Sequence, residues 1–231
     1  MIGIIGAMEE EVSQLIEAME NKEKVTCAGM DFYSGTLKGK DAVVVQSGIG
    51  KVNMALCTQI LADKFDVEAV INTGVAGSLR AEINIGDIVV STDALQHDMD
   101  ATGFGYEPAE IPLMGKKTFE ADASLRSLIA ETCREVNPEI GVFEGRVVSG
   151  DQFISDGDVK DRLVRMFAPY CTEMEGAAIA QAAWLNQIPF VIIRAISDKA
   201  DGSAHMDYSE FEAKAIEHTV RLVEAAAAKL A

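Results

Sequence analysis

The chain has 231 residues, of which 48% are hydrophobic and 5 are proline, so it can bury a large core, and we expect one domain over residues 1–231. The net charge of -17 argues against nucleic acid or an anionic membrane surface as a partner, because both are bound by clustered lysine and arginine. Residues 1–8 are apolar, but no basic segment leads them and three glutamates follow, which does not fit a signal peptide or membrane span and predicts a cytoplasmic protein.

Short apolar segments alternate along the chain with longer stretches of helical period. This alternation is typical of an α/β domain built around a largely parallel sheet. The apolar segments predict six strands, which are residues 2–5, 42–46, 69–72, 87–91, 146–149 and 190–196.

Four stretches carry a helical pattern between or after these strands. Apolar side chains recur at helical spacing over residues 12–19 and 125–136, which predicts two amphipathic helices that cover the sheet. Residues 174–185 are Ala-rich and apolar on every side, which predicts a helix inside the core. A last helix is expected over about residues 208–230. Residues 102–118, rich in glycine and proline, predict a long loop of the kind that is often functional.

The cysteines and histidines give little support for a disulfide or a metal site. Cys27, Cys57, Cys133 and Cys171 lie far apart in apolar segments, so we expect them to be reduced core residues. The segment from His97 to Asp100 could suggest a metal, but the chain has only 3 histidines and no H-E-x-x-H motif. We therefore interpret His97 as a surface or interface residue and predict no metal.

Ligands of open α/β sheets bind beyond the carboxyl ends of the strands. Here those ends carry glycine and short polar residues, as in Ser47-Gly48, Asn72-Thr73-Gly74 and Ser149-Gly150-Asp151. Neither a phosphate-binding loop nor a G-x-G-x-x-G motif follows a predicted strand. Nucleoside triphosphates and dinucleotides are therefore poor candidates for the ligand.

Carboxylates are the remaining candidates for chemistry. Cleavage of a glycosidic bond needs an acid near the leaving group and a second carboxylate near the cationic sugar. Glu11 lies in the first turn of a predicted helix beside its apolar stripe, where the helix dipole favours the ionised form, so it could act as a base. Glu9 and Glu10, further from that stripe, are expected to be solvated charges.

Three more charged residues lie within or next to apolar segments. Glu175 opens the most apolar helix and Arg194 lies inside the last predicted strand, so each needs a partner or a ligand to offset its lost hydration. From the residues alone, a structural ion pair between Arg194 and a nearby glutamate explains them equally well. Asp198, at the end of that strand, is likewise open to either a functional or a structural interpretation.

Six motifs that occur in order along the chain carry a family resemblance: residues 4–11, 47–52, 72–74, 148–151, 173–175 and 194–198. Together they closely resemble the bacterial 5'-methylthioadenosine/S-adenosylhomocysteine nucleosidases of the purine nucleoside phosphorylase/uridine phosphorylase superfamily. The resemblance implies an α/β fold of three layers with a central mixed, twisted sheet flanked by helices. It also implies a homodimer without metal or cofactor that hydrolyses the N-glycosidic bond of both nucleosides, and of 5'-deoxyadenosine, for methionine salvage and the methyl cycle.

The resemblance assigns catalytic roles to residues of the matching motifs. Glu11 orients and activates the attacking water, and Asp198 donates a proton toward N7 of adenine. Glu175 holds the ribose hydroxyls and stabilises the oxocarbenium-like transition state. Arg194 helps to set the carboxylates, and Ser197 supports Asp198.

The resemblance also implies the positions that bind the nucleoside. Phe153 stacks on adenine, Ile154 offers backbone hydrogen bonds to its edge, and Met174 packs at the ribose. Val75 stands where relatives often carry serine, which removes a hydroxyl from the ribose side of the pocket. Met8, Ile49 and Tyr208 surround the 5'-substituent. Gly77 and Glu173 lie in the site, where Glu173 is either a contact or a supporting residue. Ala101, Phe104 and Pro112 reach into the site of the neighbouring subunit.

Two other functions compete with hydrolysis. A nucleoside phosphorylase would use phosphate as the nucleophile, but Glu11 would repel an anion at that place. A noncatalytic nucleoside-binding module would have no evident use for Glu11, Glu175 and Asp198. Measuring adenine release with and without phosphate distinguishes a phosphorylase from a hydrolase. Binding of adenosine analogues without turnover would support the noncatalytic module.

Overall fold

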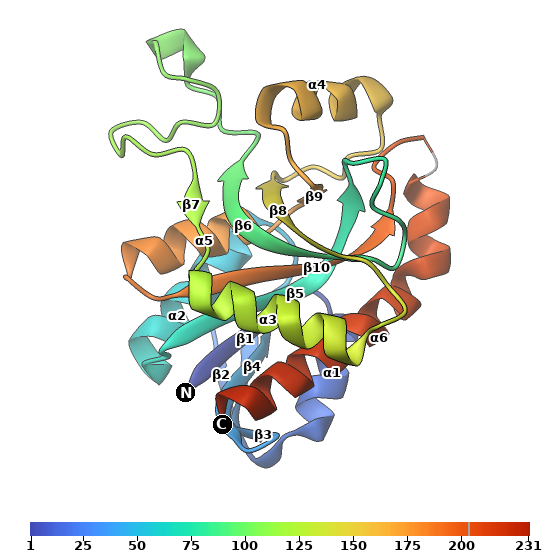
Figure 1. The fold of residues 1–231 in the computed structure, drawn as a ribbon. Coiled ribbons are helices and arrows are strands. Elements are labelled where there is room, and N and C mark those ends of the chain that lie inside the picture. Colours follow the sequence, from blue (N-terminus) through green and yellow to red (C-terminus); the bar gives the residue numbers. More distant parts are fainter. Residues whose placement is uncertain (203) are drawn as a thin grey trace.

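The computed structural model describes residues 1–202 and 204–231, except for the side chains of residues 205–210. Ten strands form one mixed sheet with helices on both of its faces (Figure 1). The strands are β1 (Ile2–Gly6), β2 (Glu20–Cys27), β3 (Met30–Leu37), β4 (Lys40–Gln46), β5 (Ala69–Ser78), β6 (Ile88–Gln96), β7 (Phe119–Glu120), β8 (Val142–Ser149), β9 (Cys171–Glu173) and β10 (Phe190–Asp198). The helices are α1 (Glu9–Ala18), α2 (Lys51–Phe65), η1 (Thr102–Phe104), α3 (Ala123–Val136), α4 (Gly157–Phe167), α5 (Gly176–Leu185) and α6 (Ala204–Leu230).

The strand order is β10-β6-β8-β9-β5-β1-β4-β3-β2, with β7 paired to β6. β1 pairs in parallel with β4 and β5, and β10 pairs in parallel with β5. Because β10 also pairs with β6, the sheet curls back on itself around β5, β9, β8, β6 and β10. The carboxyl ends of β1, β5 and β10 therefore meet at one edge, where α/β proteins bind ligands.

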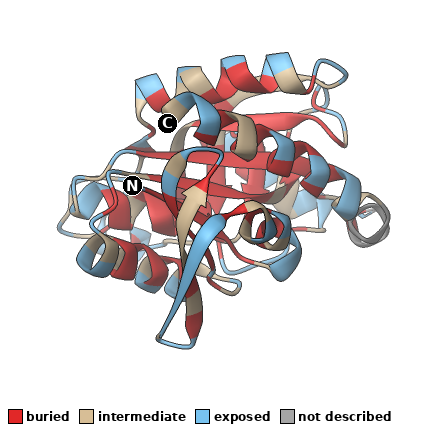
Figure 2. Ribbon diagram, turned by 90° about the horizontal axis from the view of Figure 1, so that it is seen from below, coloured by how far each residue is buried: buried red, intermediate tan, exposed pale blue. Residues whose placement is uncertain are grey.

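Alternation of side chains along the strands sends them into the two largest of three core clusters. Ile5 points toward one cluster, which it shares with α2 and α5, while Ile4 points toward the other, which it shares with α1, α3 and α6. Figure 2 shows buried strands between helices whose outward faces are exposed. The three-layer α/β fold with a mixed sheet, expected from the resemblance, is thus confirmed.

Most of the predicted elements are present, with shifted ends. All six predicted strands occur, but β5 and β6 continue past the predicted ends to Ser78 and Gln96. The last helix begins at Ala204, earlier than expected. Residues 102–118 are a loop apart from η1 and an isolated bridge between Ile111 and Lys116. The sequence did not indicate β2, β3, β7, β9, α2 or α4.

The prediction for the cysteines holds at three of the four positions. Cys57, Cys133 and Cys171 are buried, and burial raises the pKa of the Cys133 thiol to about 11. Cys27 is only half-buried, because it ends the exposed edge strand β2, so it is not a core residue. All four are free thiols. Within the described residues, no helix has the length and apolar character that a membrane crossing requires.

Candidate active site

A cavity of about 340 Å³ lies at the sheet edge where β1, β5 and β10 end. Four carboxylate residues reach its wall from three parts of the chain. Its lining consists of Ala7, Met8, Glu11, Ile49, Val75, Ala76, Gly77, Phe153, Thr172, Glu173, Met174, Glu175, Ser197 and Asp198. Three of the four catalytic candidates therefore line this one cavity, and the fourth, Arg194, lies directly behind it.

Glu11 enters the cavity wall from the first turn of α1. Its side chain is 2% exposed, and its Oε2 accepts hydrogen bonds from the N–H groups of Ala7 (2.7 Å) and Met8 (3.1 Å). Its Oε1 accepts one from the N–H of Val75 at 3.2 Å. Burial raises the pKa of Glu11 above its ordinary value, although the Arg194 charge and these N–H groups oppose that shift. Glu9 and Glu10, in contrast, are exposed, as predicted.

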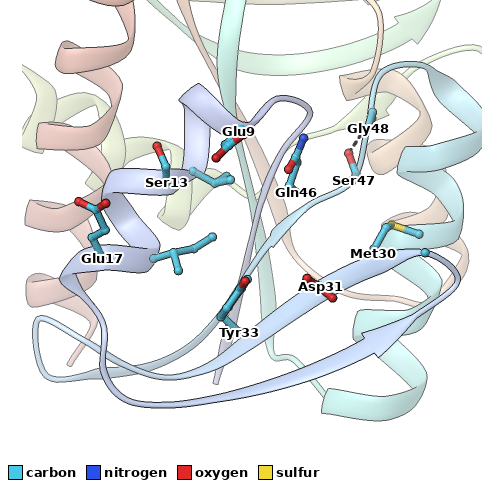
Figure 3. Close-up of a pocket in the computed structure, with 12 residues that line it drawn as sticks. Glu9, Ser13, Glu17, Met30, Asp31, Tyr33, Gln46, Ser47 and Gly48 are labelled. Carbon is cyan, nitrogen blue, oxygen red and sulfur yellow. Dashed lines mark hydrogen bonds between the residues drawn. The ribbon is translucent and has the colours of Figure 1, made fainter.

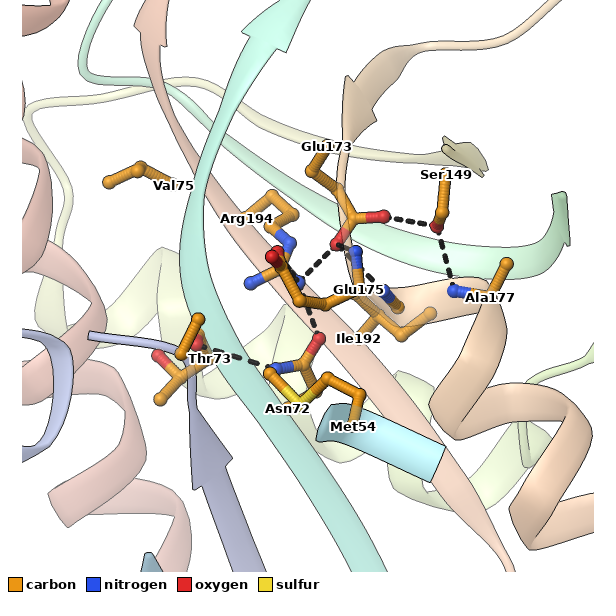
Figure 4. A network of polar contacts seen from close by, with 12 residues as sticks. Met54, Asn72, Thr73, Val75, Ser149, Glu173, Glu175, Ala177, Ile192 and Arg194 are labelled. Atoms are coloured by element: carbon orange, nitrogen blue, oxygen red, sulfur yellow. Dashed lines mark hydrogen bonds and ion pairs between the residues drawn. The ribbon is translucent and has the colours of Figure 1, made fainter. Parts of the chain in front are cut away.

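Arg194 is the centre of a buried network behind the cavity (Figure 4). Its guanidinium makes an ion pair with Glu173 and lies 3.8 Å from Glu175 Oε2. Arg194 Nη2 also donates to Asn72 Oδ1 at 2.6 Å. Although burial lowers its pKa, the charges of Glu173, Glu175 and Glu11 raise the pKa of the guanidinium above its ordinary value. Arg194 is therefore a fixed cation that offsets the lost hydration of the carboxylates.

Glu175 sits at the N-cap position of α5, between this network and the cavity. Its Oε1 accepts a hydrogen bond from the N–H of Gly50 at 3.0 Å. Burial and the neighbouring Glu173 charge raise the pKa of Glu175 to about 7, against the opposing effect of Arg194. This carboxylate thus changes its charge near neutral pH.

Two neutral polar residues that the sequence did not single out as site residues complete the network. Asn72 donates from Nδ2 to the Ile5 carbonyl at 2.9 Å, which fixes the amide that binds Arg194. Ser149 Oγ donates to Glu173 Oε1 and accepts from the N–H of Ala177 at 2.7 Å. Both sit at strand ends, where short polar residues are common for structural reasons, so their position alone did not mark them.

Asp198 lies at the end of β10 and is 2% exposed. Its Oδ2 accepts from Ser197 Oγ at 2.9 Å and its Oδ1 accepts from the N–H of Ala200 at 2.7 Å. Two donors therefore orient the carboxyl group in the cavity wall. Ser197 contacts Asp198 directly, as the resemblance implied.

The positions expected to bind the nucleoside are largely gathered around the same cavity. Met8, Ile49, Gly77, Phe153 and Met174 all line it. Ile154 is buried and lines an adjoining recess of about 30 Å³ that also reaches Asp198. The side chain of Tyr208 lies outside the described residues. Val75 lines the cavity, so its isopropyl group occupies the wall where a serine hydroxyl would stand.

The three positions expected to serve a neighbouring subunit lie away from this cavity. Ala101, Phe104 and Pro112 do not contribute to its lining. Ala101 is buried and Pro112 half-buried, whereas Phe104 is 88% exposed and Leu113 beside the proline is 95% exposed. The loop that carries them projects from the body of the fold (Figure 1).

A larger hollow of about 570 Å³ lies between α1, β3 and the end of β4 (Figure 3). Its acidic residues are Glu9 and Glu17 on α1 and Asp31 on β3. Asp31 is already bound by Thr26 Oγ1 at 2.5 Å and Lys24 Nζ at 3.1 Å. The Glu9 and Glu17 side chains are exposed charges of a solvated helix face. None of the candidate catalytic residues lines this hollow.

Metal ligands do not cluster anywhere in the described part of the chain. His97, expected at the surface or an interface, is half-buried, and its Nε2 has no hydrogen-bond partner among the described atoms. Burial lowers its pKa below the ordinary value, despite the nearby charges of Asp98 and Glu173.

Comparison with known proteins places this geometry in a family context. A model of the phosphorylase superfamily matches residues 1–228. The 5'-methylthioadenosine/S-adenosylhomocysteine nucleosidase of Staphylococcus aureus (strain JH9) is 40% identical over 231 residues, which is 100% of both chains. The structure of such a nucleosidase from Colwellia psychrerythraea in complex with adenine has a TM-score of 0.95 and 38% identity, covering 99% of this chain and 95% of its own. Futalosine hydrolase of Helicobacter pylori has a TM-score of 0.92 and 34% identity, covering 97% and 96%.

Proposed function

The chain belongs to the phosphorylase superfamily, and we propose that it hydrolyses the N-glycosidic bond of 5'-methylthioadenosine and S-adenosylhomocysteine. The products are adenine and the 5'-substituted ribose. The main support is that one cavity at the sheet edge is lined by three carboxylates from separate elements, Glu11, Glu175 and Asp198. Paired carboxylates of this kind are what acid-assisted glycosidic cleavage requires.

Water is the nucleophile in this proposal, and Glu11 is its base. Among the described residues, the cavity lining contains four carboxylate residues and no lysine or arginine. A phosphate anion would be repelled there, which favours a hydrolase over a phosphorylase. Burial raises the pKa of Glu11, which makes its carboxylate a better proton acceptor than a solvated glutamate.

Glu175 stabilises the positive charge that develops on the ribose as the bond breaks. A carboxylate held in a cavity wall interacts strongly with such a charge because little water screens it. Arg194 keeps Glu173 and Glu175 in place from behind. We assign Arg194 this positioning role because it is not part of the cavity lining.

Asp198 donates a proton to the leaving adenine, and Ser197 orients it. Phe153 and Ile154 bind the base, since both lie on the side of the cavity that carries Asp198. Met8 and Ile49 form an apolar wall for the 5'-substituent, with Tyr208 expected beside them. An apolar wall accepts an alkylthio group and leaves a 5'-phosphate without a cationic partner.

We further propose that the active form is a homodimer in which Phe104 and Pro112, with Ala101 behind them, complete the partner's site. The exposure of Phe104 and Leu113 supports this arrangement, because isolated chains seldom leave such side chains in water. Residues 1–231 then act as one nucleosidase domain, as the superfamily match over residues 1–228 supports. A cytoplasmic location stays a prediction from the sequence.

The decisive experiment measures adenine release from 5'-methylthioadenosine, S-adenosylhomocysteine, 5'-deoxyadenosine and adenosine monophosphate in phosphate-free buffer. We expect turnover of the first three, no stimulation by added phosphate, and poor turnover of the monophosphate. Strict dependence on phosphate would instead identify a phosphorylase. Binding of the nucleosides without adenine release would identify a noncatalytic module.

A second candidate substrate is aminodeoxyfutalosine, and a single observation favours its inclusion. The structural similarity to the futalosine hydrolase of Helicobacter pylori is nearly as high as that to the nucleosidase of Colwellia psychrerythraea, with TM-scores of 0.92 and 0.95. The same assay should therefore include aminodeoxyfutalosine, and the ratio of kcat/KM values ranks it against 5'-methylthioadenosine.

A further inference from the structure

The start of α2 and two loops meet behind the adenine side of the cavity. One of these loops follows β6 and the other follows β8. The three segments carry Lys51, Asp98 and Asp151, whose side chains and backbone groups bind one another. The loop after β8 continues from Asp151 to Phe153 and Ile154, the residues proposed to bind adenine.

Lys51 and Asp98, both half-buried, form the centre of this junction. Lys51 Nζ lies 2.6 Å from Asp98 Oδ1 and 3.0 Å from Gln96 Oε1. Their side chains are only 17% and 18% exposed, so the pair is poorly screened by water. Burial raises the pKa of Asp98, but its hydrogen bonds from Lys51 and Asp151 more than offset this and hold the pKa below its ordinary value. Asp98 therefore carries its negative charge at neutral pH.

The loop after β8 is held by this pair through its backbone. Asp98 Oδ2 accepts a hydrogen bond from the N–H of Asp151 at 3.0 Å. Close packing supports the same link, because a Cβ on Gly150 would lie 2.5 Å from ring atoms of His97. Phe153 is 43% exposed. Packing around its ring therefore fixes its position only in part, and the backbone that precedes it contributes the rest.

The start of α2 is held by the same junction. Its N-cap residue, Gly50, has no side chain to bind the free N–H groups of the first turn. Asp151 supplies the missing acceptor from another loop, since its Oδ1 accepts from the N–H of Lys51 at 2.9 Å. The neighbouring N–H of Gly50 donates to Glu175 at 3.0 Å. The same junction thus connects the loop after β8, on the adenine side, to the Gly50 N–H that binds Glu175 on the ribose side.

We propose that Lys51 and Asp98 are positioning residues that hold residues 150–154 in the conformation that binds adenine. The inference rests on the proposed function, because it takes the base to lie against Phe153 and Ile154. Without the ion pair, the loop would have to be ordered when the base binds, and that cost would appear as weaker binding.

The test compares Lys51→Met, Asp98→Ala and the double variant with the wild-type protein. Titration calorimetry measures the dissociation constant of adenine at 25 °C, and steady-state kinetics with 5'-methylthioadenosine gives KM and kcat. We expect each single variant to weaken adenine binding and raise KM by about tenfold, or 1.4 kcal/mol. Glu11 and Asp198 are held by other elements, and neither substitution removes the Gly50 N–H that binds Glu175, so kcat should change by less than about threefold. The double variant should be no worse than either single variant, because each breaks the same link.

The matched control is Lys229→Met. Lys229 Nζ also lies 2.6 Å from a carboxylate, that of Glu135, but this pair is 39% and 61% exposed and far from the cavity in sequence and fold. Such a surface pair contributes little, so adenine binding should stay at the wild-type value. Should Asp98→Ala fail to fold, Asp98→Asn keeps an oxygen for the Asp151 N–H and removes only the charge.

Thermal unfolding distinguishes positioning from simple stabilisation. A purely structural role would lower Tm while adenine affinity at 25 °C stays within about twofold of wild type in both single variants, and that result overturns the inference. Equal loss in Lys229→Met would also overturn it. A wild-type protein that binds adenine but cleaves none of the nucleosides would refute the proposed function alone. A wild-type protein that does not bind adenine would refute both.

Discussion

The charged residues of the site are mutually dependent, and this dependence explains why they tolerate burial. Arg194 is 1% exposed and would be strongly destabilising alone, but Glu173 and Asn72 bind its guanidinium and Glu175 lies 3.8 Å away. Removing one partner of such a group leaves an uncompensated buried charge. Three carboxylate residues, Glu173, Glu175 and Glu11, thus surround one guanidinium, and a cationic ribose would favour their ionised forms.

Replacing Asp198 by asparagine tests the proposed acid. The change keeps the size of the side chain and its contact with Ser197 but removes the proton that adenine requires. We expect turnover of 5'-methylthioadenosine to fall at least about a hundredfold, since general acids contribute roughly 10²–10⁴. Circular dichroism should be unchanged, and the exposed Asp161→Asn should behave as wild type. Near wild-type turnover in Asp198→Asn would mean that another group donates the proton.

The raised pKa of Glu175 predicts a pH dependence. Its pKa is about 7, so the free enzyme loses the negative charge on Glu175 as the pH falls through 7. Because the ionised form stabilises the transition state, kcat/KM should fall with decreasing pH, with a midpoint near pH 7. The measurement is a kcat/KM profile between about pH 5.5 and 8.5. A flat profile over that interval would contradict the assignment, and Glu175→Gln should be slow and lack this acidic limb.

At the residue scale, the sequence predicted the charged side chains of the site better than the neutral ones. Glu175 and Arg194 lie within or beside apolar segments, where burying a charge is costly, so a charged residue there indicates a functional or structural role. Asn72 and Ser149 carry no such signal, because amides and hydroxyls are common at strand ends and turns. Their partners come from distant segments, which only the tertiary structure brings together.

At the element scale, β5 passes very close to the catalytic groups. Gly74 lies in this strand, and a Cβ there would be 2.2 Å from Arg194 Nη1 and 2.6 Å from Glu11 Oε1. Both groups are buried and hydrogen-bonded, so neither can move away without breaking contacts. The strand therefore needs glycine at this position to let the two charged groups lie against its backbone.

The change Gly74→Ala should inactivate the protein without unfolding it. The methyl group would displace Arg194 and Glu11, and misplacement by about 1 Å can lower turnover roughly a hundredfold. Adenine release and thermal unfolding would be measured together. The control is Gly157→Ala at the start of α4, where a Cβ meets nothing within 4 Å. If Gly74→Ala retained full activity, the close approach of β5 to these groups would not matter for catalysis.

The elements that were not predicted were missed for different physical reasons. β2 is an exposed edge strand rich in charged residues, so it lacks the apolar alternation that marks a strand. α2 has apolar residues all around it, such as buried Met54 and exposed Val52, which blurs the stripe of an amphipathic helix. α4 has two buried side chains, Leu163 and Phe167, among many charges. Elements with a strong pattern, such as β1 and α3, were predicted to within a few residues.

At the scale of the whole molecule, exposed apolar side chains gather at the start of α2, beside the cavity, and on the projecting loop. Ile49, Val52 and Leu56 line the start of α2 with exposures of 53%, 78% and 44%. Phe104 and Leu113, on the projecting loop, are 88% and 95% exposed. With a net charge of -17, two chains repel one another at long range, so a stable dimer would have to rely on apolar contact at close range. These side chains offer that contact.

A final prediction concerns assembly and the completeness of the site. Sedimentation at micromolar concentration should give twice the chain mass of 24.8 kDa. Leu113→Asp and Phe104→Asp each place a charge where the proposed interface buries an apolar side chain, so both should shift the protein toward monomer. Because Phe104 lies outside its own cavity, a monomer would lack part of the wall around the 5'-substituent. We therefore expect kcat/KM for 5'-methylthioadenosine to fall at least about tenfold, mainly through KM.

Leu185→Asp, at the 58% exposed end of α5, is a comparison at another exposed leucine. A wild-type monomer with full activity would show that each chain completes its own site.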